Sequence, residues 1–487
     1  MSKSCSALTF APAAEVAALI KRGEVSSLEL LEHYFSRIDK YDSQLNAIVW
    51  QQRNEARAQA KAADGAIRRG EDVGALHGVP MTIKESYDVV GYPTTWGRPD
   101  LKDNFPQHDA LAVARLKKAG AIIFGKTNVP YGLADFQSYN EIYGTTNNPW
   151  DLARSPGGSS GGSAVSLAVG FSALDAGSDI GGSIRNPAHF CGLFGHKPTW
   201  NLVPPRGHAL PGTLASADLS VIGPLARSAN DLELALKVMA GPDEIQSNGL
   251  QVQLPPVTKK TSELRVAVWD DDELAPVAVA IRDQVGAVAE TLSKLGANVE
   301  PTARPEWSAE AMHNTYQCLL NATMTCRVPP ETFKELLTGT AGIDEFGCSS
   351  EEQAVLARVA RFRNWVQYNE ERTKIRWAWH NFFQTYDILI APIMSTSAFA
   401  HDHRAFSERT ISVNGRDQAY FTQLFWAGLA VNAYLPSTVI PTGLESENKL
   451  PIGVQIIGPE YSDLITIGIA RLLESEGYTF TPPPLFP

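Results

Sequence analysis

Two segments rich in glycine and serine, together with one lysine, hold the residue types from which a reactive centre could be built. The segments are residues 155–163, with the sequence SPGGSSGGS, and residues 177–185, with the sequence GSDIGGSIR. Lys84 ends an apolar strand pattern that starts at Gly78. Because glycine tolerates positive φ, successive N–H groups in such segments can turn toward one point and hold an anion. That anion is either a phosphate or the oxyanion that develops during acyl transfer.

Three interpretations of these segments can be compared. A phosphate loop would need Gly-Lys-Ser or Gly-Lys-Thr at its end, and neither segment has it. Residues 157–161 satisfy the G-x-S-x-G pattern of a nucleophile elbow, but the residues before Pro156 do not form a strand pattern, and the ten histidines leave the rest of a triad open. The third interpretation is a serine nucleophile with a lysine base, because burial at the end of an apolar strand can keep Lys84 neutral near pH 7. A solvated lysine at a strand end is the alternative without chemistry.

From about residue 10 to residue 480 the chain resembles the amidase signature family. The resemblance rests first on the Gly/Ser-rich residues 155–195, which look like the family's defining segment. Three further segments also look like family segments: YGTTNNPWD at 143–151, GPLAR at 223–227 and LPIGVQ at 450–455. The resemblance implies a Ser–Ser–Lys triad in which Ser183 is the nucleophile, Ser159 the bridging serine and Lys84 the base. Their separations along the chain, 75 and 24 residues, agree with the family pattern.

The resemblance also implies how this triad works. Ser183 would attack a carbonyl carbon, and its proton would pass through the Ser159 hydroxyl to neutral Lys84. The proton would return to the leaving amine, and water would hydrolyse the acyl-enzyme by the same relay. In this family the Gly158–Ser159 peptide bond is expected to be cis.

Other residues of the predicted site follow from the same resemblance. The backbone N–H groups of Ile180, Gly181 and Gly182, with that of the nucleophile, would hold the oxyanion. Gln137 lies where family members often line the substrate pocket, and we expect it to make a polar contact with the substrate. Ser160 is also expected in the substrate site, where its hydroxyl would orient the loop.

Neighbouring polar residues have less specific predicted roles. Asp179 and Ser178 are expected to orient the glycine-rich loop, and Arg185 to be a structural ion-pair partner. The sequence His401-Asp402-His403 lacks the further ligand spacing that a metal site needs. No metal and no cofactor are therefore expected.

Composition narrows the class of protein. The chain has 487 residues, is 44% hydrophobic and has a net charge of −11, and no basic run is present, so a nucleic-acid-binding protein is not expected. Five scattered cysteines without a framework spacing are typical of a reducing compartment. The N-terminus has no apolar signal core, and the uncharged stretches at 155–174 and 419–444 are interrupted by glycine, proline and polar residues. We therefore expect a cytoplasmic protein without a membrane contact.

Helix and strand patterns alternate along most of the chain, which predicts an α/β class. Ser26 and Glu29 form a capping box before a helix with an apolar face. Further helices are predicted at 55–69, 109–119, 276–295 and, as a pair, within 351–386, and strands at 45–50, 121–124, 264–269 and 298–300. Residues 241–263 are predicted to be a surface linker. We expect one large α/β domain over residues 1–487, with a twisted mixed β-sheet covered by helices on both faces. Its parts would be a helical N-terminal segment 10–70, a signature core 75–235 and a C-terminal half 264–480.

The function implied by the resemblance is hydrolysis of a carbon–nitrogen amide bond in a small molecule. Aryl-acyl amides and carbamates are the candidate substrates, because one relay serves both. A first alternative is the glutaminase subunit of a tRNA-dependent amidotransferase, which would depend on a partner protein. A second is a noncatalytic binding protein on the same fold, against which the intact Lys84, Ser159 and Ser183 argue. A homodimer is compatible with the sequence.

Overall fold

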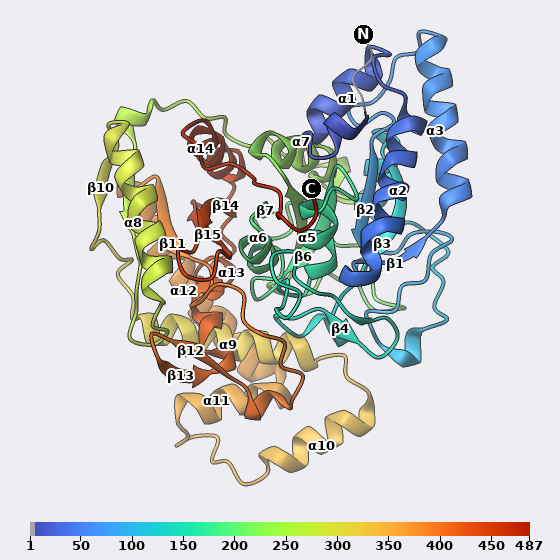
Figure 1. Ribbon diagram of the computed structural model, residues 1–487. Coiled ribbons are helices and arrows are strands. Elements are labelled where there is room, and N and C mark those ends of the chain that lie inside the picture. Colours follow the sequence, from blue (N-terminus) through green and yellow to red (C-terminus); the bar gives the residue numbers. More distant parts are fainter. Residues whose placement is uncertain (1–4) are drawn as a thin grey trace.

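A computed structural model describes residues 5–487 of the chain. Its centre is an eight-stranded sheet with the strand order β10-β9-β11-β15-β14-β7-β8-β6 (Figure 1). Strand β9 is parallel to β10 and β11, and every other neighbouring pair is antiparallel, so the sheet is mixed, as predicted. The part of the domain prediction that concerns residues 1–4 lies outside this description. The strands are β6 (Asp175–Asp179), β7 (Phe194–Lys197), β8 (Val221–Ala226), β9 (Arg265–Val268), β10 (Asn298–Glu300), β11 (Ile388–Pro392), β14 (Ser437–Leu444) and β15 (Pro451–Ile457).

A second, three-stranded sheet lies beside the first at its β6 edge (Figure 1). It consists of β1 (Ile48–Gln51), β3 (Ile122–Thr127) and β2 (Pro80–Lys84), with β3 in the middle, parallel to β2 and antiparallel to β1. All of β2 is buried, including its polar residues Thr82 and Lys84. Two short hairpins complete the strands: β4 (Tyr139–Asn140) with β5 (Gly144–Thr145), and β12 (Thr410–Val413) with β13 (Arg416–Ala419).

The N-terminal helices α1 (Ala13–Lys21), α2 (Ser27–Leu45) and α3 (Arg53–Arg68) gather around the smaller sheet (Figure 1). The predicted start of α2 is confirmed, since the Ser26 side chain accepts a hydrogen bond from the N–H of Glu29. The return bond of the predicted capping box, from the Ser26 N–H to the Glu29 side chain, is not formed in the described residues. One face of α2, including Leu31 and Phe35, is buried. The buried face fixes α2 to the rest of the domain by removing apolar area from water.

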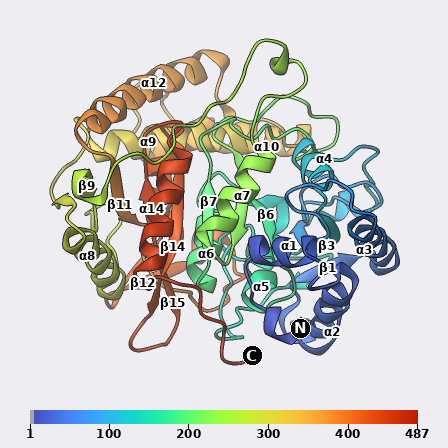
Figure 2. The same cartoon turned by 90° about the horizontal axis from the view of Figure 1, so that it is seen from above.

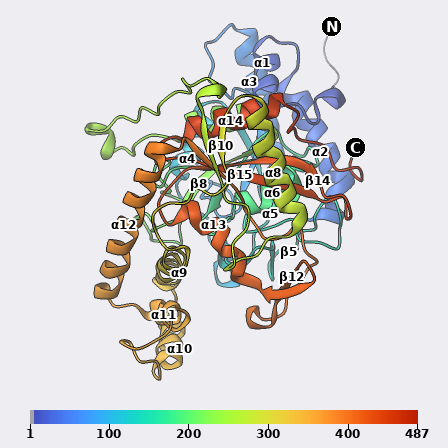
Figure 3. The ribbon, with the colours of Figure 1, turned by 90° about the vertical axis from the view of Figure 1, so that its left-hand side faces the viewer.

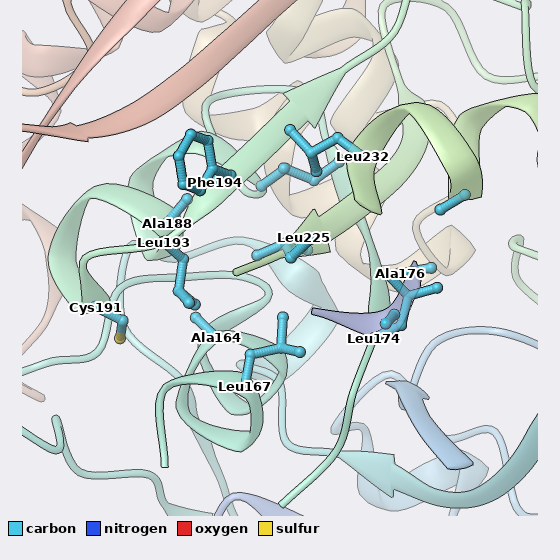
Figure 4. Close-up of a cluster of buried hydrophobic side chains, with 14 of the residues drawn as sticks. Ala164, Leu167, Leu174, Ala176, Ala188, Cys191, Leu193, Phe194, Leu225 and Leu232 are labelled. Atoms are coloured by element: carbon cyan, nitrogen blue, oxygen red, sulfur yellow. The ribbon is translucent and has the colours of Figure 1, made fainter. Parts of the chain in front are cut away.

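Helices cover both faces of the main sheet near the glycine-rich segments. Figure 4 shows Leu225 of β8 between Leu167 of α5 (Gly161–Ala168) and Leu232 of α7 (Ala229–Met239). The short helix α6 (Arg185–Cys191) packs on β7, β14 and β15, and α14 (Asp463–Ser475) lies beside α7 (Figure 2). The residues between β6 and α6 therefore sit at the edge of a well-packed core.

The remaining helices are α4 (Leu111–Lys118), α8 (Val279–Lys294), α9 (Ala309–Thr325), α10 (Pro330–Thr340), α11 (Ser350–Leu356), α12 (Phe362–Thr385) and α13 (Leu424–Val431). Helices α9 and α12 run side by side, and α10 and α11 project from them on one side of the molecule (Figure 3). Two helices, α11 and α12, lie within residues 351–386, where a pair was predicted, and each packs against α9. The aromatic side chains of α12 are only partly in the core, since Phe362 and Trp377 are exposed. Among residues 5–487, no helix is long and apolar enough to cross a membrane.

Candidate active site

Lys84 is the last residue of β2, the strand that contacts the edge strand β6 of the main sheet, and it is completely buried. Its Nζ is 2.6 Å from the Oγ of Ser159 and 2.9 Å from the Oγ of Ser178. Burial lowers the pKa of Lys84 to about 7, although the carboxylates of Asp179 and Asp175 act in the opposite direction. A large fraction of this amine is therefore neutral and able to accept a proton near pH 7.

Ser159 lies in the loop that leads into α5, and the Gly158–Ser159 peptide bond is cis, as the resemblance implied. Glycine is required at position 158 by a close approach of the backbone. A Cβ atom there would lie 2.4 Å from the carbonyl oxygen of Asp135 and 2.7 Å from the nitrogen of Gln137. The Gly158 N–H donates to Oδ1 of Asn186 at 3.0 Å. The loop is thus locked between two neighbouring segments, which holds the Ser159 hydroxyl at Lys84.

Ser183 lies in the turn between β6 and α6. Its carbonyl oxygen accepts a hydrogen bond from the N–H of Ser160 at 3.1 Å, and its side chain faces a cavity at 6% exposure. No hydrogen bond joins the hydroxyls of Ser183 and Ser159 in the part of the chain that the structure describes. The structure therefore puts Lys84 and Ser159 in direct contact and joins the Ser183 backbone to Ser160, the residue that follows Ser159.

The loop that precedes Ser183 is held by a buried ion pair between the residues on its two sides, Asp179 and Arg185. Arg185 donates to both carboxylate oxygens of Asp179 at 3.0 and 2.9 Å, and both side chains are completely buried. Burial alone would raise the pKa of Asp179, but Arg185 holds it below its usual range. The same carboxylate accepts the N–H groups of Gly182 at 2.9 Å and of Ile184 at 3.1 Å. The structural role predicted for Arg185 agrees with this geometry.

The N–H groups of the predicted oxyanion loop, residues 180–183, are therefore not all free to bind an oxyanion. The N–H of Gly182 is directed at Asp179, in a residue with a φ of +105°. Within residues 5–487, the N–H groups of Ile180, Gly181 and Ser183 have no hydrogen-bond acceptor. These three N–H groups, rather than that of Gly182, are available to an oxyanion in this conformation.

A cavity of about 410 Å³ opens in front of Ser183. Most of its wall is apolar. Five segments contribute: the loop at 133–136, residues 180–183, helix α9, residues 351–358 around α11, and residues 421–424 at the start of α13. The side chains that line it include Leu133, Phe136, Ile180, Gln317, Leu320, Asn321, Met324, Glu351, Val355, Arg358, Phe421 and Leu424. A ligand placed against Ser183 would therefore lie mainly on carbon atoms.

Gln137 and Ser160 do not line this cavity. Gln137 is completely buried, and its amide exchanges two hydrogen bonds with the backbone of Asp402, at 2.6 and 2.9 Å. The Ser160 hydroxyl is 3.4 Å from both the N–H and the carbonyl of Ser178. The Gln137 amide would have to give up these bonds to make the predicted substrate contact, because both of its ends already bind the backbone of Asp402.

A second contact ties this segment to the cavity wall, and it could not be recognised in the sequence. Asp135 accepts from Arg409 at 2.7 Å and from the hydroxyl of Tyr420 at 2.6 Å, in a buried pair. Together with the Gln137 contact, this forms a clamp, by which we mean the bonds of Asp135 and Gln137 to residues 402–420. The clamp positions Phe421, which lines the cavity.

The nucleophile elbow, which the sequence left open, is not formed. The Ser159 hydroxyl contacts Lys84 and not a histidine, and no strand leads directly into Ser159. The strand–turn–helix geometry of an elbow is therefore lacking. His401 lies 3.1 Å from Asn147, and the ring of His403 stacks on Tyr139. Within residues 5–487, no group of three or more His, Cys, Asp or Glu residues is placed to hold a metal ion.

Comparison with known proteins gives consistent matches over nearly the whole chain. The sequence matches the protein family described as Amidase over residues 29–466. It is 33% identical over 495 residues to a subunit of the glutamyl-tRNA(Gln) amidotransferase of Anaeromyxobacter dehalogenans, covering 96% of this chain and 97% of that protein. It is 34% identical over 483 residues to the indoleacetamide hydrolase of Bradyrhizobium diazoefficiens, covering 95% of this chain and 86% of that protein. A bacterial aryl acylamidase of known structure, from the amidase signature enzymes, superposes with a TM-score of 0.80 at 26% identity, covering 96% of each chain.

Proposed function

The chain belongs to the amidase signature family, and we propose that it hydrolyses the carbon–nitrogen bond of a small-molecule amide through an acyl-enzyme on Ser183. One observation carries the proposal. A completely buried lysine with a pKa of about 7 touches the hydroxyl of Ser159, and Ser183, which lines a cavity, accepts a backbone hydrogen bond from Ser160, the next residue along the chain. This arrangement supplies a base, a proton relay and a nucleophile without a histidine.

The proposed reaction begins when the Oγ of Ser183 attacks the carbonyl carbon of the amide. Its proton moves to the Oγ of Ser159, whose own proton moves to the neutral amine of Lys84. The proton then returns by the same route to the leaving nitrogen, because an amide anion is a poor leaving group. Water attacks the resulting ester with the same relay, which releases the acid and restores Ser183.

The developing oxyanion would be bound by the free N–H groups of the oxyanion loop. In the geometry described above these belong to Ile180, Gly181 and Ser183, while Gly182 serves Asp179. A single donor of this kind typically contributes a factor of roughly 10²–10³ to kcat. Preorganisation of the loop by the Asp179–Arg185 pair supports this role, because the donors need not reorganise during the reaction.

The cavity favours an apolar acyl group, such as an arylacetyl or aryl group. Phe136, Phe421 and Leu424 lie at its wall together with further aliphatic side chains. The names of two matched proteins, an indoleacetamide hydrolase and an aryl acylamidase, are consistent with an aromatic amide. A carbamate would use the same relay, since its carbonyl carbon is attacked in the same way.

A second candidate is the glutaminase function of an amidotransferase subunit. It is favoured by the match over nearly the full length to a subunit of a glutamyl-tRNA(Gln) amidotransferase. The cavity wall also includes Glu351 and Arg358, whose opposite charges could pair with the ammonium and carboxylate of free glutamine. This function would require a partner protein that receives the ammonia.

The experiment that tests the proposal is a comparison of amide hydrolysis by the wild-type protein and Ser183→Ala. Ammonia release is measured with phenylacetamide, indole-3-acetamide and L-glutamine, and release of 4-nitroaniline with 4-nitroacetanilide. We expect aryl amides to give the highest kcat/KM, and we expect Ser183→Ala to hydrolyse none of the four substrates. Preference for glutamine, together with a copurifying protein, would support the second candidate. Turnover that survives in Ser183→Ala would contradict both.

A further inference from the structure

The oxyanion loop has a second anchor in addition to Asp179. The hydroxyl of Tyr316, in α9, donates a hydrogen bond of 2.9 Å to the carbonyl oxygen of Ile180. Tyr316 is completely buried. Room for its ring is made by Gly428 of α13, where a Cβ atom would lie 2.6 Å from the ring. The contact is thus a fixed part of the fold and not an incidental surface bond.

This contact orients the peptide unit between Ile180 and Gly181. A trans peptide is planar, and its C=O and N–H groups point in opposite directions. Holding the Ile180 carbonyl toward Tyr316 therefore directs the Gly181 N–H away from Tyr316. No hydrogen bond within residues 5–487 takes this N–H, and Gly181 lines the same cavity as Ser183.

The two anchors act on successive peptide units of one short loop. Tyr316 binds the carbonyl of Ile180, while Asp179 binds the N–H of Gly182. Glycine at position 181 offers no side chain to fix its conformation, since it lacks a Cβ atom. Without the Tyr316 hydroxyl, the Ile180–Gly181 peptide would be held only by its neighbours along the chain and could rotate.

We propose that Tyr316 is a positioning residue for the oxyanion site: its hydroxyl holds the Ile180–Gly181 peptide so that the Gly181 N–H points at the tetrahedral intermediate on Ser183. The proposal rests on the proposed function, because it needs an oxyanion at Ser183. Helix α9 also supplies Leu320 and Gln317 to the cavity wall. The helix that contacts the acyl group is therefore the helix that fixes the oxyanion loop.

The test is Tyr316→Phe, which removes the hydroxyl and keeps the ring. We expect kcat to fall on the order of tenfold or more while KM changes little, because the lost interaction acts on the transition state and not on the bound amide. This is less than the roughly 10²–10³-fold effect of deleting an oxyanion donor. Binding of phenylboronic acid, whose adduct with Ser183 places an anionic oxygen in the same position, should weaken by a similar factor.

A matched control is Tyr92→Phe. Tyr92 is also a buried tyrosine whose hydroxyl donates to a backbone carbonyl, that of Ile123 at 3.0 Å, and it does not line the cavity. Both variants lose one such bond, so a similar decrease in Tm is expected. Only Tyr316→Phe should lower kcat. Titration of Ser183 with a fluorophosphonate normalises each rate to the folded fraction.

Failure of the positioning role and failure of the proposed function would give different results. A kcat of Tyr316→Phe within twofold of wild type, with unchanged phenylboronic acid binding, would overturn the positioning role and leave the proposed function intact. An equal loss of kcat in Tyr92→Phe would overturn it as well, because the effect would then be one of general stability. A wild-type protein without Ser183-dependent turnover would instead remove the proposed function, and the positioning role with it.

Discussion

Lowering the pH from about 8 to 5 is expected to switch the enzyme off, because the active form of Lys84 is the neutral amine. Burial brings the pKa of Lys84 from its usual 10.5 to about 7. At pH 7 about half of the lysine is then neutral, whereas at a pKa of 10.5 the neutral fraction would be about 3 × 10⁻⁴. Burial thus makes roughly 10³-fold more base available. We expect kcat/KM to rise with pH, with an inflection near 7 and a tenfold fall for each unit below about 6.

The assignment of this inflection is tested with two buried lysines on neighbouring strands. Lys84→Met is expected to lose roughly 10³-fold or more in kcat/KM at every pH and to lose the inflection. Lys126 of β3 is also completely buried, but its Nζ binds the carbonyls of Glu85 and Pro93, both at 2.7 Å. Lys126→Met should therefore lower Tm and keep both the inflection and most of the kcat/KM of its folded fraction.

The assay is the initial rate of amide hydrolysis between about pH 5 and 9, with thermal unfolding of each variant measured in parallel. An inflection near 7 that persists in Lys84→Met would show that another group titrates. A wild-type profile that rises only near pH 10 would show that burial does not shift the lysine, and the proposed base would have to be abandoned.

Three further predictions concern the clamp and the cavity. Asp135→Asn should lower the free energy of unfolding by about 3–5 kcal/mol in urea titration, because Arg409 would stay buried without its partner; an unchanged midpoint would contradict the buried pair. Gln137→Leu should lose both bonds to Asp402, with a loss of about 1–3 kcal/mol in the same assay; normal stability combined with a large increase in KM would instead favour the predicted substrate contact. Phe421→Ala should raise KM for phenylacetamide by roughly tenfold with little change in kcat, since about 1–3 kcal/mol of apolar contact is lost; an unchanged KM would place the acyl group elsewhere.

Local patterns in the sequence predicted much of the fold. The cap at Ser26, the buried stripe of α2 and strand β10 at residues 298–300 appear where the pattern placed them. These features depend on residues three or four apart, or on short apolar runs, so one sequence suffices to find them. Helix α5 was not among the predicted helices; it is buried throughout because its small residues let it enter the core.

Contacts between distant segments could not be predicted in this way. Gln137 meets Asp402 and Tyr316 meets Ile180 over separations of 265 and 136 residues, and no periodicity records such pairs. The separate three-stranded sheet is another case, because strand patterns do not specify their partners. The three triad positions came from the resemblance, and residue types alone would have left Ser159 and Ser183 equivalent as nucleophiles.

The most direct measurement is the site of covalent labelling by a fluorophosphonate. The reagent would form a phosphonate ester with the nucleophilic serine and release fluoride, and peptide mapping by mass spectrometry locates the adduct without knowledge of the substrate. We expect an adduct on Ser183 that is lost in Ser183→Ala and forms far more slowly in Lys84→Met. An adduct on Ser159, or labelling that persists in Ser183→Ala, would contradict it.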